Sequence, residues 1–489
     1  MNARPLSLGA LGALGAAMVL AGCAAVGPDY RPPAVPLAES GFIGVGVPAL
    51  DSRPVPEDIA SFWRGFGDAA LTALVERAVQ ANGDVRVAQA RLQEARALQD
   101  ETDAATRPGL GIDTSVQRAV APQTQQPGAS RSARTGNTFD ASFIAGWEID
   151  LFGRLRRGSE QAAALAEAGE AGVAAARTAV AAEVARNYLE LRGLQQRLQF
   201  TQDSLVNQRD ALRITRARVD NGRGTQLDLA RAQGLVAGTE AAVPALQSAI
   251  ERTVFRLATL TAQSPRVLLS SLATPAPLPG LPVTDLARLP VGTPEQWLQR
   301  RPDLIVAERQ VAAATAGIGI ARSELYPRIS LSGLLGLNAA TLSGLASGDA
   351  LRYSVGAGLS WTPFDLGAIR SRIRGSEARA AQSLASFEAT VGAALEETEG
   401  AFSSYTRNAQ RADRLALATR SATEAAQLAR LRYDAGVTDF LAVLDAEREV
   451  LSQRDQLVQA QVGTATALVA VYRALGGGWT PPGATAATR

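Results

Sequence analysis

The sequence predicts a mixed α and β protein built from two related halves, with four membrane-type β-strands and several long helices per chain. One supporting observation is an internal repeat that runs through most of the 489 residues. The other is the alternation of short period-two segments with long proline-free segments that carry a seven-residue apolar repeat. We expect the strands to belong to an oligomeric β-barrel and the helices to continue it as a coiled-coil barrel.

The two halves align in a nearly constant register. A shift of 214 positions brings Trp147 onto Trp361, and a shift of 219 brings Pro108 onto Pro327. The first pair of strands must therefore have a longer loop than the second. Each half is predicted as a helix, two strands, a long helix and a further helix. The predicted divisions are a signal peptide 1–22, an extended segment 23–60, a first repeat 61–263, a proline-rich junction 264–293, a second repeat 294–475 and a flexible tail 476–489.

Four segments alternate between apolar and polar residues with a period of two. Phe139 and Trp147 lie on the apolar side of one segment, and Tyr353 and Trp361 lie on the apolar side of another. This pattern with aromatic residues on one face is typical of a membrane β-barrel strand, whose aromatic residues form a girdle at the interface. Any single segment also fits a half-buried strand of a soluble sheet. The segments are 110–118, 138–150, 328–338 and 352–362.

The helical segments are unusually long. Residues 154–220 and 368–434 contain no proline, and each would span roughly 100 Å as a helix. Seven-residue apolar spacing predicts packed helices with a left-handed supercoil. Each helix pair is predicted to turn at a glycine-containing tip. The spaced residues are Val184, Leu191, Leu198, Leu205, Leu212 and Val219 in one helix, and Leu229, Val236, Val243, Ile250 and Leu257 in the next.

The N-terminus predicts export and a lipid anchor. Arg4 precedes the apolar run 6–20, which is too short for a comfortable membrane-spanning helix and fits a secretory signal. The following Leu20-Ala21-Gly22-Cys23 resembles the bacterial lipoprotein processing site, which implies cleavage before Cys23 and its acylation. An ordinary signal peptide with an incidental cysteine is the alternative.

Composition excludes several kinds of function. The chain has no histidine and a single cysteine, so histidine-dependent triads, histidine metal sites and intrachain disulfides are excluded, and no cofactor or metal is expected. Its 49 basic and 47 acidic residues nearly balance, without the clustered basic face that nucleic-acid binding requires. Carboxylate-only catalysis, as in glycosidases, is the enzyme alternative that remains.

Four strands cannot close a barrel, and lipid does not tolerate an open sheet edge. The chain must therefore complete its sheet with other copies. Two copies would give eight strands with a filled interior, whereas three would give twelve and leave a lumen. Four of the helical segments of each chain would form a second barrel around the same axis.

Several motifs bring a family resemblance. The segment 26–33 (Val-Gly-Pro-Asp-Tyr-Arg-Pro-Pro), the pair Phe62-Trp63 and the tip Tyr433-x-x-Gly436 resemble outer-membrane efflux lipoproteins of the TolC/OprM-like family, NodT branch. This resemblance implies a homotrimer in the outer membrane that extends into the periplasm. It also implies a passive exit duct, not an enzyme, that works with a periplasmic adaptor and an inner-membrane resistance-nodulation-division transporter. A type I protein-secretion duct and a periplasmic coiled-coil scaffold are the alternatives.

The resemblance also implies the position of an aperture. Carboxylates near the periplasmic tips surround a constriction in this family, and Asp445 matches one such position. Ala442 replaces a second aspartate, but the first half carries Asp228 and Arg231 at the positions of Ala442 and Asp445. A solvated tip charge without a role in the duct is the alternative interpretation of each.

Further tip residues are expected to close the aperture and to bind the adaptor. The resemblance makes Tyr433 and Asp228 candidates for a link between helix pairs. Thr438 stands where the family often has an arginine, so the link differs here. The expected adaptor-docking residues are Gly222, Gly224, Gly436, Val437 and Thr438.

Overall fold

The computed structural model describes residues 25–34, 59–282 and 300–477. Cys23, the predicted signal peptide and residues 478–489 lie outside this part. The chain forms two compact units, of which unit 1 comprises 1–33, 92–168 and 307–387, and unit 2 comprises 34–91, 169–306 and 388–489. Each unit takes segments from both sequence repeats, so the compact units do not follow the duplication.

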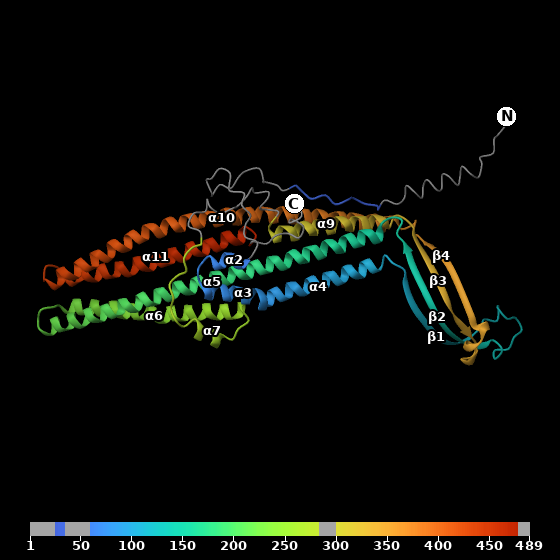
Figure 1. Cartoon of the computed structure of the whole chain (residues 1–489), viewed down its shortest axis with the longest axis horizontal. Helices are drawn as coiled ribbons and strands as arrows, with labels where there is room; N and C mark the ends of the chain where they lie inside the picture. Colours follow the sequence, from blue (N-terminus) through green and yellow to red (C-terminus); the bar gives the residue numbers. More distant parts are fainter. Residues whose placement is uncertain (1–24, 35–58, 283–299, 478–489) are drawn as a thin grey trace, which may run out of the picture. The chain divides into compact units, whose positions relative to one another are not determined.

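Unit 1 contains one antiparallel sheet whose strand order follows the chain (Figure 1). The pairing of β2 with β3 joins the two sequence repeats in this sheet. The four predicted segments are confirmed as strands, and the loop 121–134 is longer than the loop 340–350 as predicted. The strands are β1 (Gly109–Val120), β2 (Thr135–Ile149), β3 (Arg328–Ala339) and β4 (Leu351–Ser360).

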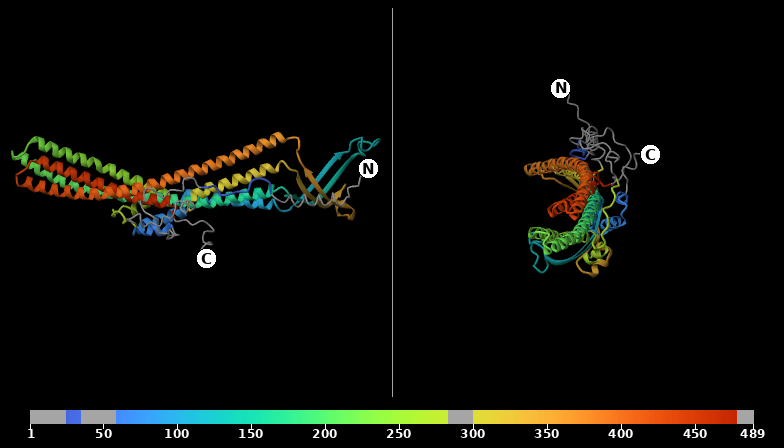
Figure 2. Two further views of the ribbon diagram at one scale, coloured as in Figure 1. Left: turned by 90° about the horizontal axis from the view of Figure 1, so that it is seen from above. Right: turned by 90° about the vertical axis from the view of Figure 1, so that its left-hand side faces the viewer.

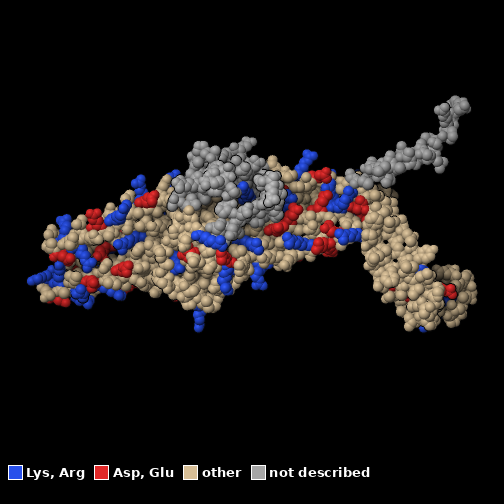
Figure 3. All heavy atoms as spheres, viewed as in Figure 1, with Lys and Arg blue, Asp and Glu red and all other residues tan. Residues whose placement is uncertain are grey.

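The register of the strands gives the sheet one apolar and one mostly polar face. Ile112 pairs with Phe143, which pairs with Leu335, which pairs with Tyr353, so these four side chains share a face. Large apolar residues on this face are exposed in the single chain, with Val355 87% exposed. Figure 3 shows few charged side chains on the visible side of the sheet, whereas the helices carry many.

The two repeated tryptophans fasten the sheet to the helices within unit 1. Trp147 Nε1 donates to the carbonyl oxygen of Thr106 at 3.0 Å, just after helix α4 (Gly83–Ala104). Trp361 Nε1 donates to the carbonyl oxygen of Leu325 at 3.1 Å, just after helix α9 (Pro302–Ser323). The duplication has therefore preserved a contact as well as a sequence pattern.

Helix α9 is apolar and long enough to span a bilayer, but half of its most apolar window is buried, as in a packed core helix.

Unit 2 contains most of two antiparallel helix pairs (Figure 2), whose long helices begin in unit 1. Helix α5 (Arg154–Asp220) pairs with α6 (Gln226–Leu260), and α10 (Leu366–Asp434) pairs with α11 (Phe440–Ala474). The long proline-free segments are thus confirmed as continuous helices. The predicted seven-residue row on α5 is buried at Val184 and Leu191.

Three short helices differ from the prediction. The first half begins with α2 (Ile59–Arg64) and α3 (Ala69–Ala81) before α4, where a single helix was expected. Gly67, with φ +66, lies in the turn between α2 and α3, and the Asp68 carboxylate caps α3 by accepting from two backbone amides. Helix α7 (Pro265–Ser271) lies inside the predicted junction 264–293. Local features such as the Asp68 cap of α3 and the proline at the start of α7 define these short helices, and apolar periodicity does not reveal them.

The last helix of each repeat ends in the same way. Asn82 Nδ2 donates to the carbonyl oxygen of Leu260 at 2.9 Å, and Arg301 donates to that of Ala474 at 3.1 Å. The next turn adopts a left-handed residue in both repeats, Ala262 with φ +49 and Gly476 with φ +89. Ala262 is the only non-glycine residue with positive φ in the described part of the chain.

The left-handed position predicts a matched pair of stability effects. Ala262→Gly should stabilise the protein by about 1 kcal/mol, because a Cβ atom is strained in this conformation. Gly476→Ala should destabilise it by more, because the new Cβ would also lie 3.0 Å from the carbonyl oxygen of Arg300. Thermal unfolding midpoints of the detergent-extracted variants measure both effects. A lower midpoint for Ala262→Gly would contradict the strain argument.

Candidate functional site

The sheet of unit 1 has the dimensions of a membrane-spanning segment. Trp147 and Trp361 lie near the ends of their strands that adjoin the helices, and Phe139 and Tyr353 lie eight residues away toward the loops. At ~3.3 Å per residue the two aromatic levels are about 26 Å apart, close to the height of an outer-membrane apolar band. Phe139, Trp147 and Tyr353 lie on the apolar face, Trp361 directly follows β4, and Tyr353 is 79% exposed.

The sheet is also incomplete. Strands β2 and β3 pair on both sides, whereas β1 and β4 each pair on one side in the described part of the chain. Unpaired backbone amides and carbonyls cannot face lipid without a large cost in free energy. A single chain therefore presents an apolar surface together with two edges that require further strands.

The two tips of unit 2 share one turn geometry. Gly222 and Gly436 adopt φ +71 and +74, respectively. The amide of the following residue bonds back to the helix in both tips, from Arg223 to the Arg218 carbonyl at 2.8 Å and from Val437 to the Arg432 carbonyl at 2.9 Å. These are the six-residue bonds of a glycine C-terminal cap. Gly224 has little free space, since a Cβ there would lie 3.0 Å from Val219 Cγ2, and Thr438 completes the second turn.

The helices that leave the tips have different caps. Thr225 accepts a hydrogen bond from the Asp228 amide at 3.1 Å, and its hydroxyl donates to the Asp228 carboxylate at 2.6 Å. Thr225 therefore caps the start of α6. At the start of α11 the Asp439 carboxylate accepts from the Ala442 amide at 3.2 Å. Asp439 was not singled out from the sequence, although the repeat aligns it with Thr225.

Tyr433 occupies a packed position at the second tip. The Arg218 guanidinium lies 4.0 Å from the centre of its ring, and the ring of Phe440 lies 5.3 Å away. Arg218 comes from α5, so this cation–π contact joins the two helix pairs. Among the described residues of one chain, no hydrogen bond links Tyr433 to Asp228, whose carboxylate binds Thr225 instead. A link between chains stays a prediction.

Asp445 projects from a buried cluster at the tips. Phe440, Val443 and Leu444 of α11 pack with Ala232 of α6. Next to this cluster the Asp445 side chain is 63% exposed, and the Arg448 guanidinium lies 4.0 Å from its carboxylate. Arg231 precedes the cluster residue Ala232 and is half-buried. Asp445 is thus held on a fixed helix with its charge facing solvent in the single chain.

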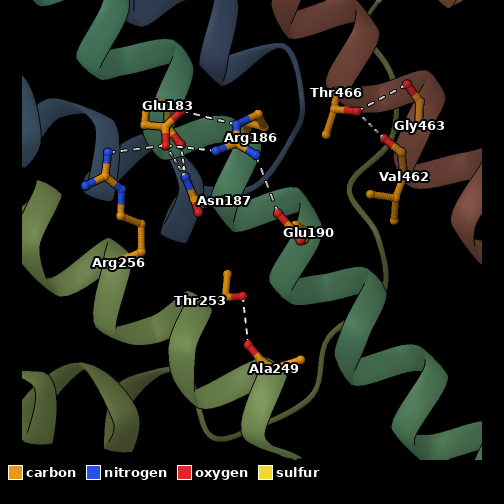
Figure 4. A network of polar contacts seen from close by, with 10 residues as sticks. All are labelled: Glu183, Arg186, Asn187, Glu190, Ala249, Thr253, Arg256, Val462, Gly463 and Thr466. Carbon is orange, nitrogen blue, oxygen red and sulfur yellow. Dashed lines mark hydrogen bonds and ion pairs between the residues drawn. The ribbon is translucent and has the colours of Figure 1, made fainter. Parts of the chain in front are cut away.

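Repeated carboxylates tie the helices together farther from the tips. Glu183 accepts from Arg186 of α5 at 2.8 Å and forms an ion pair with Arg256 of α6 at 3.4 Å (Figure 4). Its counterpart Glu397 forms ion pairs with Arg301 at 2.8 Å and with Arg473. Burial raises the pKa of Glu397, but hydrogen bonds and charges of the two arginines outweigh it, and the net pKa is below its ordinary value.

The segment after the predicted lipidation site is bound tightly within unit 1. Arg157 of α5 is 5% exposed, forms an ion pair with Asp29 at 2.7 Å and donates to the carbonyl oxygen of Val26 at 3.3 Å. Gly153 leaves no room for a side chain, since a Cβ at this position would lie 2.5 Å from the Cα of Ala25. The sequence motif 26–33 was recognised, but its partner Arg157 was missed because long-range pairing leaves no periodic pattern.

Comparison with known proteins places the chain in a family. The outer membrane efflux protein family matches residues 74–263 and 293–477. The pyoverdine export outer membrane protein OpmQ of Pseudomonas putida is 32% identical over 424 residues, covering 86% of this chain and 88% of that protein. Outer membrane protein OprJ of Pseudomonas aeruginosa is 32% identical over 481 residues, covering 95% and 94%. The solved outer-membrane channel OprN has 40% identity and a TM-score of 0.84, covering 93% of this chain and 99% of that one.

These similarities confirm the recognition made from the sequence and the predicted fold class, a membrane β-barrel sheet continued by helices. They also confirm the outer-membrane location, with helices that extend into the periplasm, and an efflux function. The relatives and structural neighbours are channels rather than enzymes. The chain belongs to the outer membrane efflux protein family, and it is an outer-membrane efflux channel.

Proposed function

We propose that three copies of this chain form one duct that passively conducts small solutes, including drugs, out of the cell. The observation that carries this proposal is the open four-stranded sheet with one apolar face. Three such sheets make a twelve-stranded barrel with a lumen, whereas two make a barrel filled by side chains. The channel itself catalyses no reaction.

The duct works as the last component of a tripartite pump in this proposal. Its partners are a periplasmic adaptor and an inner-membrane resistance-nodulation-division transporter. The adaptor binds the helical tips, where Gly222, Gly224, Gly436, Val437 and Thr438 supply exposed turns. Val437 is 66% exposed in the single chain, as an apolar docking residue should be.

A lipid on Cys23 anchors each copy beside its own sheet. Only one residue separates Cys23 from Ala25, and the backbone from Ala25 to Gly27 is bound by Arg157. Acyl chains bind a leaflet without spanning it. Because residues 25–27 are bound within unit 1, which contains the sheet, a lipid two residues before Ala25 anchors the part of the chain that must enter the membrane.

Asp445 lines the narrowest point of the closed duct in this proposal. Three copies would place three exposed carboxylates around the axis, and such a ring attracts cations. Because the carboxylates repel one another, they do not hold the aperture shut. The Arg218–Tyr433 contact within each chain and a Tyr433–Asp228 link between chains supply that closure, and Arg231 adds a compensating charge near them.

The assembly is tested by mass and by conductance. Detergent-extracted protein should sediment as three chains and should form ion-conducting channels in planar bilayers. A stable, non-conducting monomer in lipid would contradict the proposed duct. The variant Ala262→Gly, which changes a turn of unit 2 and no residue of the sheet, serves as a control that should assemble normally.

The lipid anchor predicts a labelling pattern. Palmitate fed to cells should label the wild-type chain, and Cys23→Ser should abolish the label. Arg157→Ala should keep the label but make the segment 25–34 more sensitive to protease, because its ion pair and carbonyl contacts are lost. Label that persists on Cys23→Ser would refute the anchor.

The proposed aperture predicts that one variant changes ion selectivity and that another changes the resting conductance. Asp445→Ala should weaken cation selectivity and block by trivalent cations while the trimer stays folded. Tyr433→Phe with Asp228→Ala should instead raise the resting conductance, because a polar link is lost. Single-channel recordings measure both. Unchanged selectivity and block in Asp445→Ala would make this residue a solvated tip charge and place the aperture elsewhere.

A further inference from the structure

A row of paired residues crosses the polar face of the sheet at one level. Asp113 on β1 pairs with Ser142 on β2, which pairs with Gly336 on β3, which pairs with Arg352 on β4. Neighbouring positions in each strand alternate in direction, so these residues face away from the exposed apolar side. In a barrel whose apolar side contacts lipid, this row faces the lumen.

Gly336 has no side chain, so the Arg352 side chain can cross β3. The Arg352 guanidinium donates to Ser142 Oγ at 3.2 Å and forms an ion pair with Asp140 on β2. A Cβ at Gly336 would lie 2.6 Å from the Ala141 carbonyl oxygen, so a larger residue cannot occupy this position without a shift. Asn338 Nδ2 also donates to Asp140 at 3.0 Å.

The ion pair between Asp140 and Arg352 is held by further hydrogen bonds, but its two side chains differ in exposure. The Asp140 side chain is 8% exposed, whereas that of Arg352 is 44% exposed. Ser142 donates to the second carboxylate oxygen of Asp140 at 2.7 Å. Asp140 is therefore satisfied by three neighbours, and the guanidinium both neutralises it and presents a positive edge toward the lumen.

Asp113 is the uncompensated charge of this row. It is exposed, and within the part of the chain that the structure describes it forms no hydrogen bond or ion pair. Each copy thus contributes two carboxylates and one guanidinium, and one carboxylate stays unneutralised whichever of them the guanidinium pairs with after closure. Arg328 faces the same side but lies eight residues from Gly336 along β3, about 26 Å away.

We infer that the row through Asp113 and Arg352 is a charge-selective belt of the duct inside the membrane, separate from the aperture at Asp445. This inference rests on the proposed three-copy channel. Low-dielectric walls concentrate the field of charges in a narrow passage. The excess carboxylates would favour solutes with positive charge along the outer part of the path, and Arg352 would limit that preference.

Reversal potentials in asymmetric KCl test the belt. Asp113→Asn should lower the permeability ratio of K⁺ to Cl⁻ by a factor of about two to five, the effect of removing a pore potential of order kT. Arg352→Gln should raise the ratio, because Asp140 loses its counter-charge. Dilute salt near 0.01 M keeps the Debye length at about 30 Å and the effect measurable.

The controls separate charge from folding. Asp140→Asn combined with Arg352→Gln removes a neutral pair and should restore the wild-type ratio. Arg118→Gln changes an arginine on the opposite face of β1 and should leave the ratio unchanged. Asp113→Asn breaks no contact of the described chain, so it remains informative even where Arg352→Gln reduces trimer yield.

Two outcomes have different meanings. Conducting channels whose ratio is unchanged by both Asp113→Asn and Arg352→Gln, and altered only by Asp445→Ala, would overturn the belt and leave the duct intact. Failure of the wild-type trimer to conduct would refute the proposed function instead. We expect the effects of Asp113→Asn and Asp445→Ala on the permeability ratio to multiply in the double variant, because the belt and the aperture act independently.

Discussion

The requirement that every backbone polar group in lipid be hydrogen-bonded governs this structure. A four-stranded antiparallel sheet satisfies its inner strands and leaves β1 and β4 with unpaired edges. The same sheet exposes a continuous apolar face, on which Val355 is 87% exposed and Leu110 is 85% exposed. For one chain alone, the apolar face is unfavourable in water, and the unpaired edges are unfavourable in lipid. Assembly is therefore part of folding for this protein, and the lumen is a geometric consequence of that assembly.

The duplication explains how a chain can supply equal shares of a closed duct. Each half provides a strand pair, a long helix and a returning helix, and specific contacts recur in both halves. The bonds from Trp147 and Trp361 fix the strands to the preceding helices. The bonds from Asn82 and Arg301 fix the start of one helix to the end of the last helix in each repeat. The donor is the Asn82 amide in the first half and the Arg301 guanidinium in the second, yet the accepting carbonyls occupy equivalent positions.

Periodic features of the fold could be predicted from the sequence, and pairwise ones could not. Alternation in β1 to β4 and the proline-free runs of α5 and α10 reflect which face is apolar, so they can be detected in a linear pattern. The seven-residue row of Thr201, Gln208 and Thr215 is also buried, although its polar residues concealed it. Thr201 and Thr215 bond to carbonyls of their own helix, which makes their burial possible. Arg157 and Arg352 depend on partners 128 to 212 positions away and leave no local signal.

The two tips show why the candidate aperture was the least predictable part. Their glycine turns are the same, with equivalent backbone bonds from Arg223 and Val437. Their side chains differ, because Thr225 and Asp228 cap one helix whereas Asp439 caps the other. The Asp439 carboxylate accepts from the Ala442 backbone amide, and the Asp228 carboxylate accepts from the Thr225 hydroxyl. Asp445 has no such role at its helix start and remains 63% exposed. The divergence of the two repeats has thus left one tip with an exposed carboxylate that caps no helix, which is why we propose Asp445 for the aperture.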